Sequence, residues 1–205
     1  GLGDVYKRQG NSRYKDVFAA STTADLTSFR NHWGAETSLD VALYRPVARY
    51  ELVAKDVATF LNKLSTGGLK GESFTARVKY SDYLPTGYNL WDDVPKNSLM
   101  YMEYKVAFER PADGTKDLQL GFDYVLTDAG ETVPIPVELE ILNEKNEVLA
   151  RTAFRIPCER GKNTTVRGNF LTSDINGGIG IDPDYDGDLE AVSYTHLRAH
   201  ETSAH

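Results

Sequence analysis

The chain has 205 residues, of which 40% are hydrophobic and 26% charged, and its formal net charge is −7. An acidic balance of this kind repels phosphate backbones and argues against a nucleic-acid-binding protein. No stretch approaches the roughly 20 consecutive apolar residues of a membrane helix, which argues against a membrane-spanning one.

The two ends of the chain, residues 1–9 and 192–205, are expected to be adapter-derived scars. One permitted codon string for the first nine residues, read on the opposite strand, translates as VSYTHLRA, the sequence of residues 192–199. Both ends also resemble the translated adapter of a sequencing library, so neither is used to predict the fold. Without them 20 basic and 28 acidic residues remain, a net charge of −8. The natural N-terminus, with any signal peptide or lipid anchor, is then expected to be missing.

Residues 10–37 are expected to be a loop-rich N-terminal remnant of the domain. They show no sustained periodicity and are rich in Ser, Thr, Asn and Asp. Val17, Phe18 and Trp33 are the expected buried anchors of this segment. The domain proper is expected to cover residues 38–191.

Alternating apolar and polar residues begin directly after this segment. Leu39, Val41 and Leu43 face one way, and a second run starts at Val47. Pro46 interrupts the alternation, which predicts an edge strand, or a strand with a bulge at the proline.

The periodicity then changes to that of a helix. Val57, Phe60, Leu61 and Leu64 form the apolar stripe of a short amphipathic helix. Asp56 is the expected N-cap of this helix, and the Gly-Gly pair at residues 67–68 is its expected end.

Strands dominate the rest of the chain. The alternation predicts strands within residues 73–83, 99–109, 118–128, 133–143, 148–158 and 163–172, whereas residues 84–95 are expected to form a loop. About eight strands, with no helices between them, predict an all-β fold: an antiparallel β-sandwich, transthyretin-like or immunoglobulin-like, with one short helix.

An aspartate run near the C-terminal end has part of the spacing of a calcium loop. Asp182, Asp184, Asp186 and Asp188 alternate, with Gly187 at the sixth place. The glutamate required at the twelfth place would fall in the adapter-derived segment, and no helix pattern precedes the loop. An acidic turn is therefore the first interpretation of this run, and a calcium site is the alternative.

The sequence shows no catalytic arrangement. Cys158 is the single cysteine and is expected to be a small, half-buried strand residue, and His32 is the one histidine outside the terminal segments. Asp92 and Asp93 are adjacent in an extended stretch and point to opposite faces, so they cannot flank one glycosidic bond. We expect no enzyme activity and no cofactor.

Five tyrosines gather in one region, Tyr80, Tyr83, Tyr88, Tyr101 and Tyr104. Packing in the core is the first interpretation, and an exposed aromatic contact surface is the alternative. Together with Trp91 and the aspartate run, this region leaves a carbohydrate- or calcium-binding β-sandwich module as the alternative function.

Two stretches resemble fimbrillin-like surface lipoproteins of Bacteroidales. ALYRPVARYELVA resembles their Arg-Pro strand, and the segment from FRIPCERGK to DYDGD is similar to their closing segment. The matching residues are Arg45, Pro46, Pro157, Thr164, Gly168, Leu171, Thr172, Ser173, Asp186 and Gly187.

The resemblance implies a transthyretin-like sandwich that is secreted and anchored by lipid on the cell outer membrane. It implies a role as subunit, tip or anchor of a fimbria, or as an adhesin, and it brings no catalytic residues. The implied partners are other fimbrial subunits, joined by strand addition, or glycans and proteins of host or bacterial surfaces. An open sandwich edge, which Pro46 would suit, is what strand addition requires.

Overall fold

The computed structural model describes residues 10–32, 34 and 38–173. In chain order, the elements are η2 (Arg13–Lys15), η3 (Thr27–Phe29), β1 (Val47–Ala54), α1 (Val57–Ser65), β2 (Ser73–Tyr80), β3 (Leu84–Asn89), β4 (Val94–Leu99), β5 (Glu103–Glu109), β6 (Leu118–Leu126), β7 (Thr132–Asn143), β8 (Val148–Glu159) and β9 (Asn163–Gly168). The two segments expected to be adapter-derived, residues 1–9 and 192–205, lie outside the described residues.

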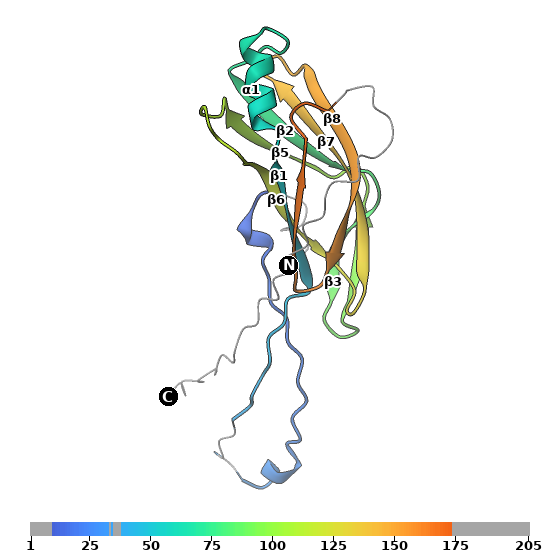
Figure 1. The fold of residues 1–205 in the computed structure, drawn as a ribbon. Helices are drawn as coiled ribbons and strands as arrows, with labels where there is room; N and C mark the ends of the chain where they lie inside the picture. Colours follow the sequence, from blue (N-terminus) through green and yellow to red (C-terminus); the bar gives the residue numbers. More distant parts are fainter. Residues whose placement is uncertain (1–9, 33, 35–37, 174–205) are drawn as a thin grey trace.

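The strands form two packed sheets and a hairpin (Figure 1). One sheet has three strands in the order β6-β1-β9, and the other has four in the order β5-β2-β7-β8. Neighbouring strands run antiparallel, except that β9 runs parallel to β1. β3 and β4 pair with each other. The predicted all-β sandwich with one short helix is confirmed.

The hydrophobic core lies between the two sheets because apolar side chains recur at every second position of the strands. In β2, every second residue from Phe74 to Tyr80 is buried, and the residues between them are half-buried. Tyr50 and Leu52 of β1 enter the same core from the other sheet, and both are fully buried.

Helix α1 closes one end of the sandwich (Figure 1). Its buried residues are Val57, Phe60 and Leu61, and Leu64 packs against the same core, as the helical stripe predicted. Phe60 meets Phe74 of β2 edge to face, with ring centroids 5.1 Å apart. The helix therefore belongs to the sandwich core and is not an appendage.

The prediction that Pro46 lies in an edge strand is wrong. Strand β1 begins at Val47, directly after the proline, and it is the central strand of its sheet. Residues 39–43 belong to no strand, and Tyr44 makes an isolated bridge with Ala19. Because a proline has no N–H to donate, the ladder starts after it and not across it.

The predicted loop at residues 84–95 is also wrong, since most of it forms the β3–β4 hairpin. Pro85, Gly87 and Pro95 give this stretch the composition of a turn. The ladder nevertheless forms, with Leu84 paired to Leu99 and Asn89 to Val94. Pairing across the hairpin has outweighed the local composition here.

The N-terminal segment is anchored only in part by the residues predicted. Val17 is half-buried and packs against a small apolar cluster on β1 and β6, whereas Phe18 is 44% exposed. Lys15 and Ala19 are also buried. Trp33 lies outside the described residues. Beyond Ala19 the chain leaves the sandwich as a long arm and returns at Tyr44 (Figure 1).

Candidate functional site

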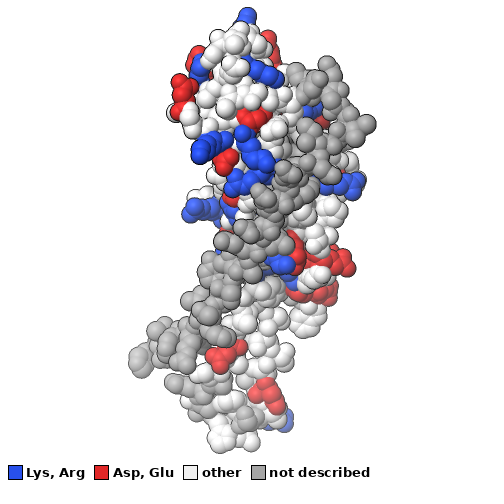
Figure 2. All heavy atoms as spheres, viewed as in Figure 1, with Lys and Arg blue, Asp and Glu red and all other residues white. Residues whose placement is uncertain are grey.

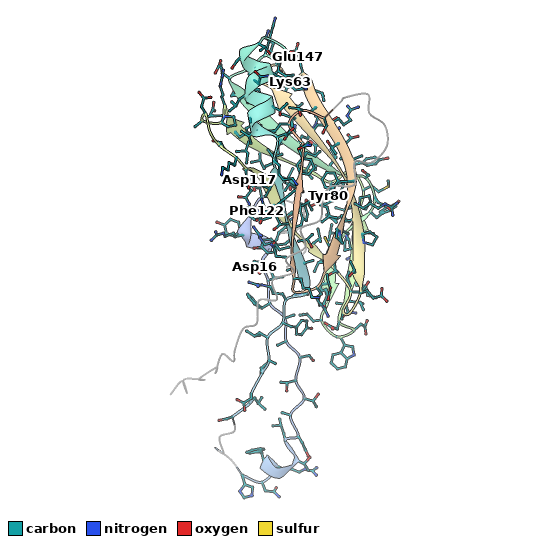
Figure 3. The ribbon with its side chains drawn as sticks, viewed as in Figure 1. Asp16, Lys63, Tyr80, Asp117, Phe122 and Glu147 are labelled. Atoms are coloured by element: carbon teal, nitrogen blue, oxygen red, sulfur yellow. The ribbon has the colours of Figure 1, made fainter. Side chains whose placement is uncertain are left out.

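One side of the sandwich is crossed by Gly10–Ala19, a segment that we call the strap. It lies along the seam, which we define as the side where the edge strands β5 and β6 of the two sheets meet. Among the described residues, one backbone hydrogen bond joins the strap to β6, from the amide N of Asn11 to the carbonyl O of Phe122 at 2.6 Å. Figure 3 shows Phe122 beside the strap. The strap thus covers the seam without adding a strand to either sheet.

The ring of Tyr104, from β5, lies between two glycines in the seam. A Cβ atom on Gly10 would lie 2.2 Å from the ring, and one on Gly121 of β6 would lie 3.0 Å from it. Only a residue without a side chain allows so close an approach at Gly10. A hollow of about 400 Å³ opens beside this point, lined by Gly10, Asn11 and residues 103–105.

A buried ion pair holds the middle of the strap. The Nζ atom of Lys15 lies 2.9 Å from both carboxylate oxygens of Asp123, and the two side chains are 2% and 0% exposed. Asp123 also accepts hydrogen bonds from the hydroxyl of Tyr80 at 2.6 Å and from the amide N of Tyr124 at 2.8 Å. The carboxylate is therefore fully hydrogen-bonded, and its one described counter-ion comes from the strap.

The network continues from Asp123 into the core through phenolic hydroxyls. Tyr80 and Tyr50 share a hydrogen bond of 2.7 Å, and the hydroxyl oxygens of Tyr50 and Tyr104 lie 3.2 Å apart. Burial, followed by the charge of Asp123, raises the pKa of Tyr80 well above its ordinary value, and burial also raises the pKa of Tyr50 and Tyr104. The three phenols stay neutral, so Lys15 and Asp123 are the charged members.

A second ion pair holds the outer end of the strap. Asp16 accepts two hydrogen bonds from Arg45, from Nε at 2.7 Å and from Nη2 at 3.0 Å. The same guanidinium lies 4.9 Å from the ring centroid of Phe18. Lys15 points inward and Asp16 outward, so adjacent strap residues of opposite charge each meet a complementary partner.

A separate cluster joins the hairpin to the rest of the fold. Arg160, in the β8–β9 turn, forms two hydrogen bonds of 2.9 Å with Asp93 and lies over the rings of Tyr44 and Tyr88. Both tyrosine hydroxyls donate to Asp93. The hydrogen bond to Asp93, followed by burial, raises the pKa of Tyr44. Asp93 is occupied by these structural contacts, and Asp92 accepts a hydrogen bond from Asn89 instead. The two aspartates lie in the β3–β4 turn, where Asp93 has a φ of 58°, and not in the predicted extended stretch.

The tip of the hairpin exposes a tryptophan. Trp91 is 93% exposed and its neighbour Leu90 is 47% exposed. The Asn89 side chain accepts hydrogen bonds from the backbone N of Trp91 at 3.0 Å and of Asp92 at 3.4 Å, which fixes the turn. A rigid turn therefore presents an indole ring that makes no contribution to the core.

The tyrosine-rich region divides between the two interpretations given to it. Tyr80 and Tyr104 are buried in the core, Tyr88 is half-buried, and Tyr83 and Tyr101 are exposed. Sequence spacing could not separate them, because Tyr83 and Tyr101 lie just outside strands β2 and β5, where alternation no longer applies.

The four-stranded sheet carries a charged ladder on its outer face. Glu140 of β7, 0% exposed, meets Arg77 and Lys79 of β2 and Arg151 of β8. Burial opposes the ionisation of Glu140, but hydrogen bonds from Lys79, Arg77 and Arg151 outweigh it and lower its pKa to about 2. Figure 2 likewise shows basic and acidic side chains interspersed over the visible face of the sandwich.

Several residues of the closing segment that resembles fimbrillin-like proteins have structural roles. The Thr164 hydroxyl donates to the carbonyl O of Pro157 at 2.7 Å. Asp56 accepts from the backbone N atoms of Leu171 and Thr172, at 3.2 and 2.8 Å, and from the Thr172 hydroxyl at 2.7 Å. Asp56 precedes α1 as predicted, but its side chain makes no cap hydrogen bond and instead binds the segment that follows β9.

Cys158 and His32, the two side chains considered for nucleophilic chemistry, lie in different surroundings. Cys158 is fully buried, and burial, followed by the charge of Asp123, raises the pKa of its thiol to about 12. His32 is exposed. The candidate calcium ligands Asp182, Asp184, Asp186 and Asp188 lie outside the described residues. Among the residues that the structure describes, no three His, Cys, Asp or Glu side chains are grouped as metal ligands would be.

No helix in the described part of the chain has the length and apolar character needed to cross a membrane. The sequence does not predict the buried lysine or its strap, because a lysine in a polar segment carries no local signal of burial.

Two solved structures, each named a putative cell adhesion protein, are similar to this chain. The one from Bacteroides ovatus has 13% identity and a TM-score of 0.33, and the match covers 62% of this chain and 45% of that one. The one from Bacteroides eggerthii has 13% identity and a TM-score of 0.30, and the match covers 70% of this chain and 54% of that one. This chain thus spans about half the length of these structures.

No curated protein matches the sequence. A family model matches residues 3–202, nearly the whole chain, and it describes a family of unknown function, DUF6562. The chain belongs to the family DUF6562.

Proposed function

We propose that the protein is a non-enzymatic, fimbrillin-like cell-surface protein, a pilus subunit or anchor or an adhesin, which joins other subunits by strand addition at the seam. The observation that carries the proposal is the way in which the seam is closed. The strap lies along β6 but, among the described residues, forms one backbone hydrogen bond with it. Strand addition requires such an edge, because an incoming strand gains affinity through backbone hydrogen bonds.

The edge of β6 is a suitable template for a strand. Within the described sheets β6 is hydrogen-bonded to β1 alone, and its other edge pairs with no strand. An edge strand presents a row of backbone N–H and C=O groups to any extended segment that reaches it. A strand from another subunit would replace the strap and form a regular ladder there.

The side chains support a role in binding and not in catalysis. The buried thiol of Cys158 is held in its neutral form at neutral pH by a pKa of about 12. Asp93 and Asp123 are each saturated with structural hydrogen bonds. The fimbrillin-like resemblance of the closing segment adds a location at the cell outer membrane through a lipid anchor.

Displacing the strap tests strand addition. We expect Gly10→Val to push the strap off the Tyr104 ring, because a Cβ at this position would lie 2.2 Å from the ring. Sedimentation velocity over a range of concentrations should then show dimers and longer assemblies. Tyr14→Val is the matched control, since Tyr14 is in the strap but is 87% exposed. If the folded Gly10→Val protein stays monomeric like the control, strand addition at the seam is refuted.

The location is tested separately on intact cells. The full-length gene is expressed in a Gram-negative host of the Bacteroidales order, and the cells are treated with an external protease. We expect the domain to be cleaved on intact cells. Protection until the cells are lysed would contradict a surface location.

A second candidate function is the binding of surface glycans at the tip of the hairpin. The observation that favours it is Trp91, 93% exposed on a turn fixed by Asn89. An indole face can pack on the apolar face of a sugar ring, and the polar turn beside it offers hydrogen bonds. On a glycan array, Trp91→Ala should abolish binding, and Leu26→Ala, which removes an exposed side chain of the arm, should not. The absence of any glycan bound by the unaltered protein would remove this candidate.

A further inference from the structure

We infer that Asp123 makes the seam selective for an incoming segment that carries a lysine followed by an acidic residue. The inference rests on the proposed strand addition and names the chemistry of the segment that can take part in it. It starts from the one feature of the strap that a partner would have to reproduce, the buried charge of Lys15.

Asp123 depends on the strap for its charge balance. Its other two hydrogen-bond donors, the Tyr80 hydroxyl and the Tyr124 amide, are neutral groups. Lys15 contacts both carboxylate oxygens at 2.9 Å, and both partners are almost completely buried. When one member of a buried ion pair is removed, the other is left as an uncompensated charge, which is strongly unfavourable. A segment that displaces the strap without bringing a cation would create this state.

The outer side of the seam sets a second requirement. Arg45 forms two hydrogen bonds with Asp16, the residue next to Lys15. Hydrogen bonds between a guanidinium and a carboxylate are among the strong ones, so loss of this acid would also weaken the fit. An incoming Lys-Asp or Lys-Glu pair meets both partners, whereas a purely apolar strand meets neither.

The burial of Asp123 explains why the cation must be carried on a long side chain. Asp123 is fully buried, so the ammonium group must reach it from the surface of the seam on a flexible aliphatic chain. Lysine provides that reach and buries its methylene groups on the way. Its point charge can also contact both oxygens of one carboxylate, as Lys15 does.

A competition between peptides tests the selectivity. The protein is the full chain with Gly10→Val and Lys15→Met, which weakens its own strap, and the probe is a fluorescent peptide with the sequence of Gly10–Ala19. The peptide with Lys15→Met should bind at least about tenfold more weakly, the order expected for loss of a hydrogen bond to a charged group. The peptide with Arg13→Met is the matched control, because it loses the same charge at an exposed position and should bind like the original.

A change in the protein completes the test. With Asp123→Asn added, the preference for the lysine peptide should disappear, because the buried charge is gone. If the protein with Gly10→Val and Lys15→Met does not fold, the chain with Lys15→Met alone takes its place in both experiments.

The outcomes separate this inference from the proposed function. Equal binding of the lysine and methionine peptides would overturn the selectivity and leave strand addition standing. Binding of neither peptide would overturn the selectivity as well. If, in addition, the Gly10→Val protein remained monomeric in the ultracentrifuge, strand addition at the seam would fall with it.

Discussion

Glu140 and Asp123 are both buried carboxylates, but their cations come from different parts of the fold. Glu140, on the outer face of the four-stranded sheet, is paired with Arg77, Lys79 and Arg151. These residues stand on the strands directly beside β7, so strand register alone brings them to Glu140.

Among the residues that the structure describes, Asp123 is paired with one cation, and this cation comes from outside the sheets. Lys15 is 108 residues away in the chain and lies on the strap. One carboxylate is therefore compensated by residues that strand register brings together, whereas the other is compensated by a segment outside the sheets. The ion pairs of the outer face thus depend on the sheet alone, and the ion pair at the seam depends on the position of the strap.

The largest expected effect is at the seam. Lys15→Met leaves Asp123 buried without a counter-ion and should lower the free energy of unfolding by about 3–5 kcal/mol. Urea denaturation at pH 7 measures it. Lys15→Met combined with Asp123→Asn removes the stranded charge and should recover part of the loss. A loss below about 1 kcal/mol for the single variant would show that the pair is not essential to the seam.

The pH dependence of stability should reveal the outer-face network. The pKa of Glu140 is lowered to about 2 in the folded protein from an ordinary value of 4.5. Its stabilisation is therefore complete above about pH 4.5 and is lost as the pH falls toward 2, because the unfolded state takes up the proton first. With allowance for screening we expect about 1–2 kcal/mol.

The measurement for Glu140 is urea denaturation of the unaltered protein and of Glu140→Gln between pH 2 and 6. The difference between the two curves should shrink as the pH falls through this window. Parallel curves would mean that Glu140 is not the group responsible.

Removing one cation of the outer face should have a smaller effect than removing the strap lysine. Arg77→Met leaves Lys79 and Arg151 to compensate Glu140, so we expect a loss of about 1 kcal/mol in urea denaturation at pH 7. If this loss equalled that of Lys15→Met, the contrast between the shared and the single counter-ion would be wrong.

The smallest effect is expected at the hairpin tip. Trp91 is 93% exposed, so Trp91→Ala should change the free energy of unfolding by less than about 0.5 kcal/mol. Thermal and urea denaturation check it. A large destabilisation would show that the indole has a structural role and would weaken the case for binding at this point.

Much of the fold could be predicted because its signals are local. The period-two runs of β2, β5, β6, β7 and β8 and the helical stripe from Val57 to Leu64 report burial on one face, and each run was found where the structure has it. The β3–β4 hairpin was missed because its prolines and glycine resemble a turn. The central position of β1 was missed because a proline before a strand is compatible with either place in a sheet.

Little of the candidate site could be predicted from the sequence. Lys15 lies in a polar stretch without periodicity, and nothing nearby marks it as buried. The alternation in β6 puts Asp123 on the face opposite Phe122 and Tyr124, which predicts an exposed side chain. In the structure the register shifts near Leu120, and Asp123 is fully buried. Its pairing with a strap 108 residues away depends on how the two sheets close. The parallel pairing of β9 with β1 is likewise a long-range contact that no local pattern encodes.

An all-β sandwich with one short helix follows from the sequence, because the alternation of apolar and polar residues sets which face of each segment is buried. The central place of β1, the division of the tyrosines between core and surface, and the pairing of a strap lysine with Asp123 do not follow from any local pattern. These are contacts between distant segments, and they arise only when the two sheets pack and leave a seam for another segment to fill.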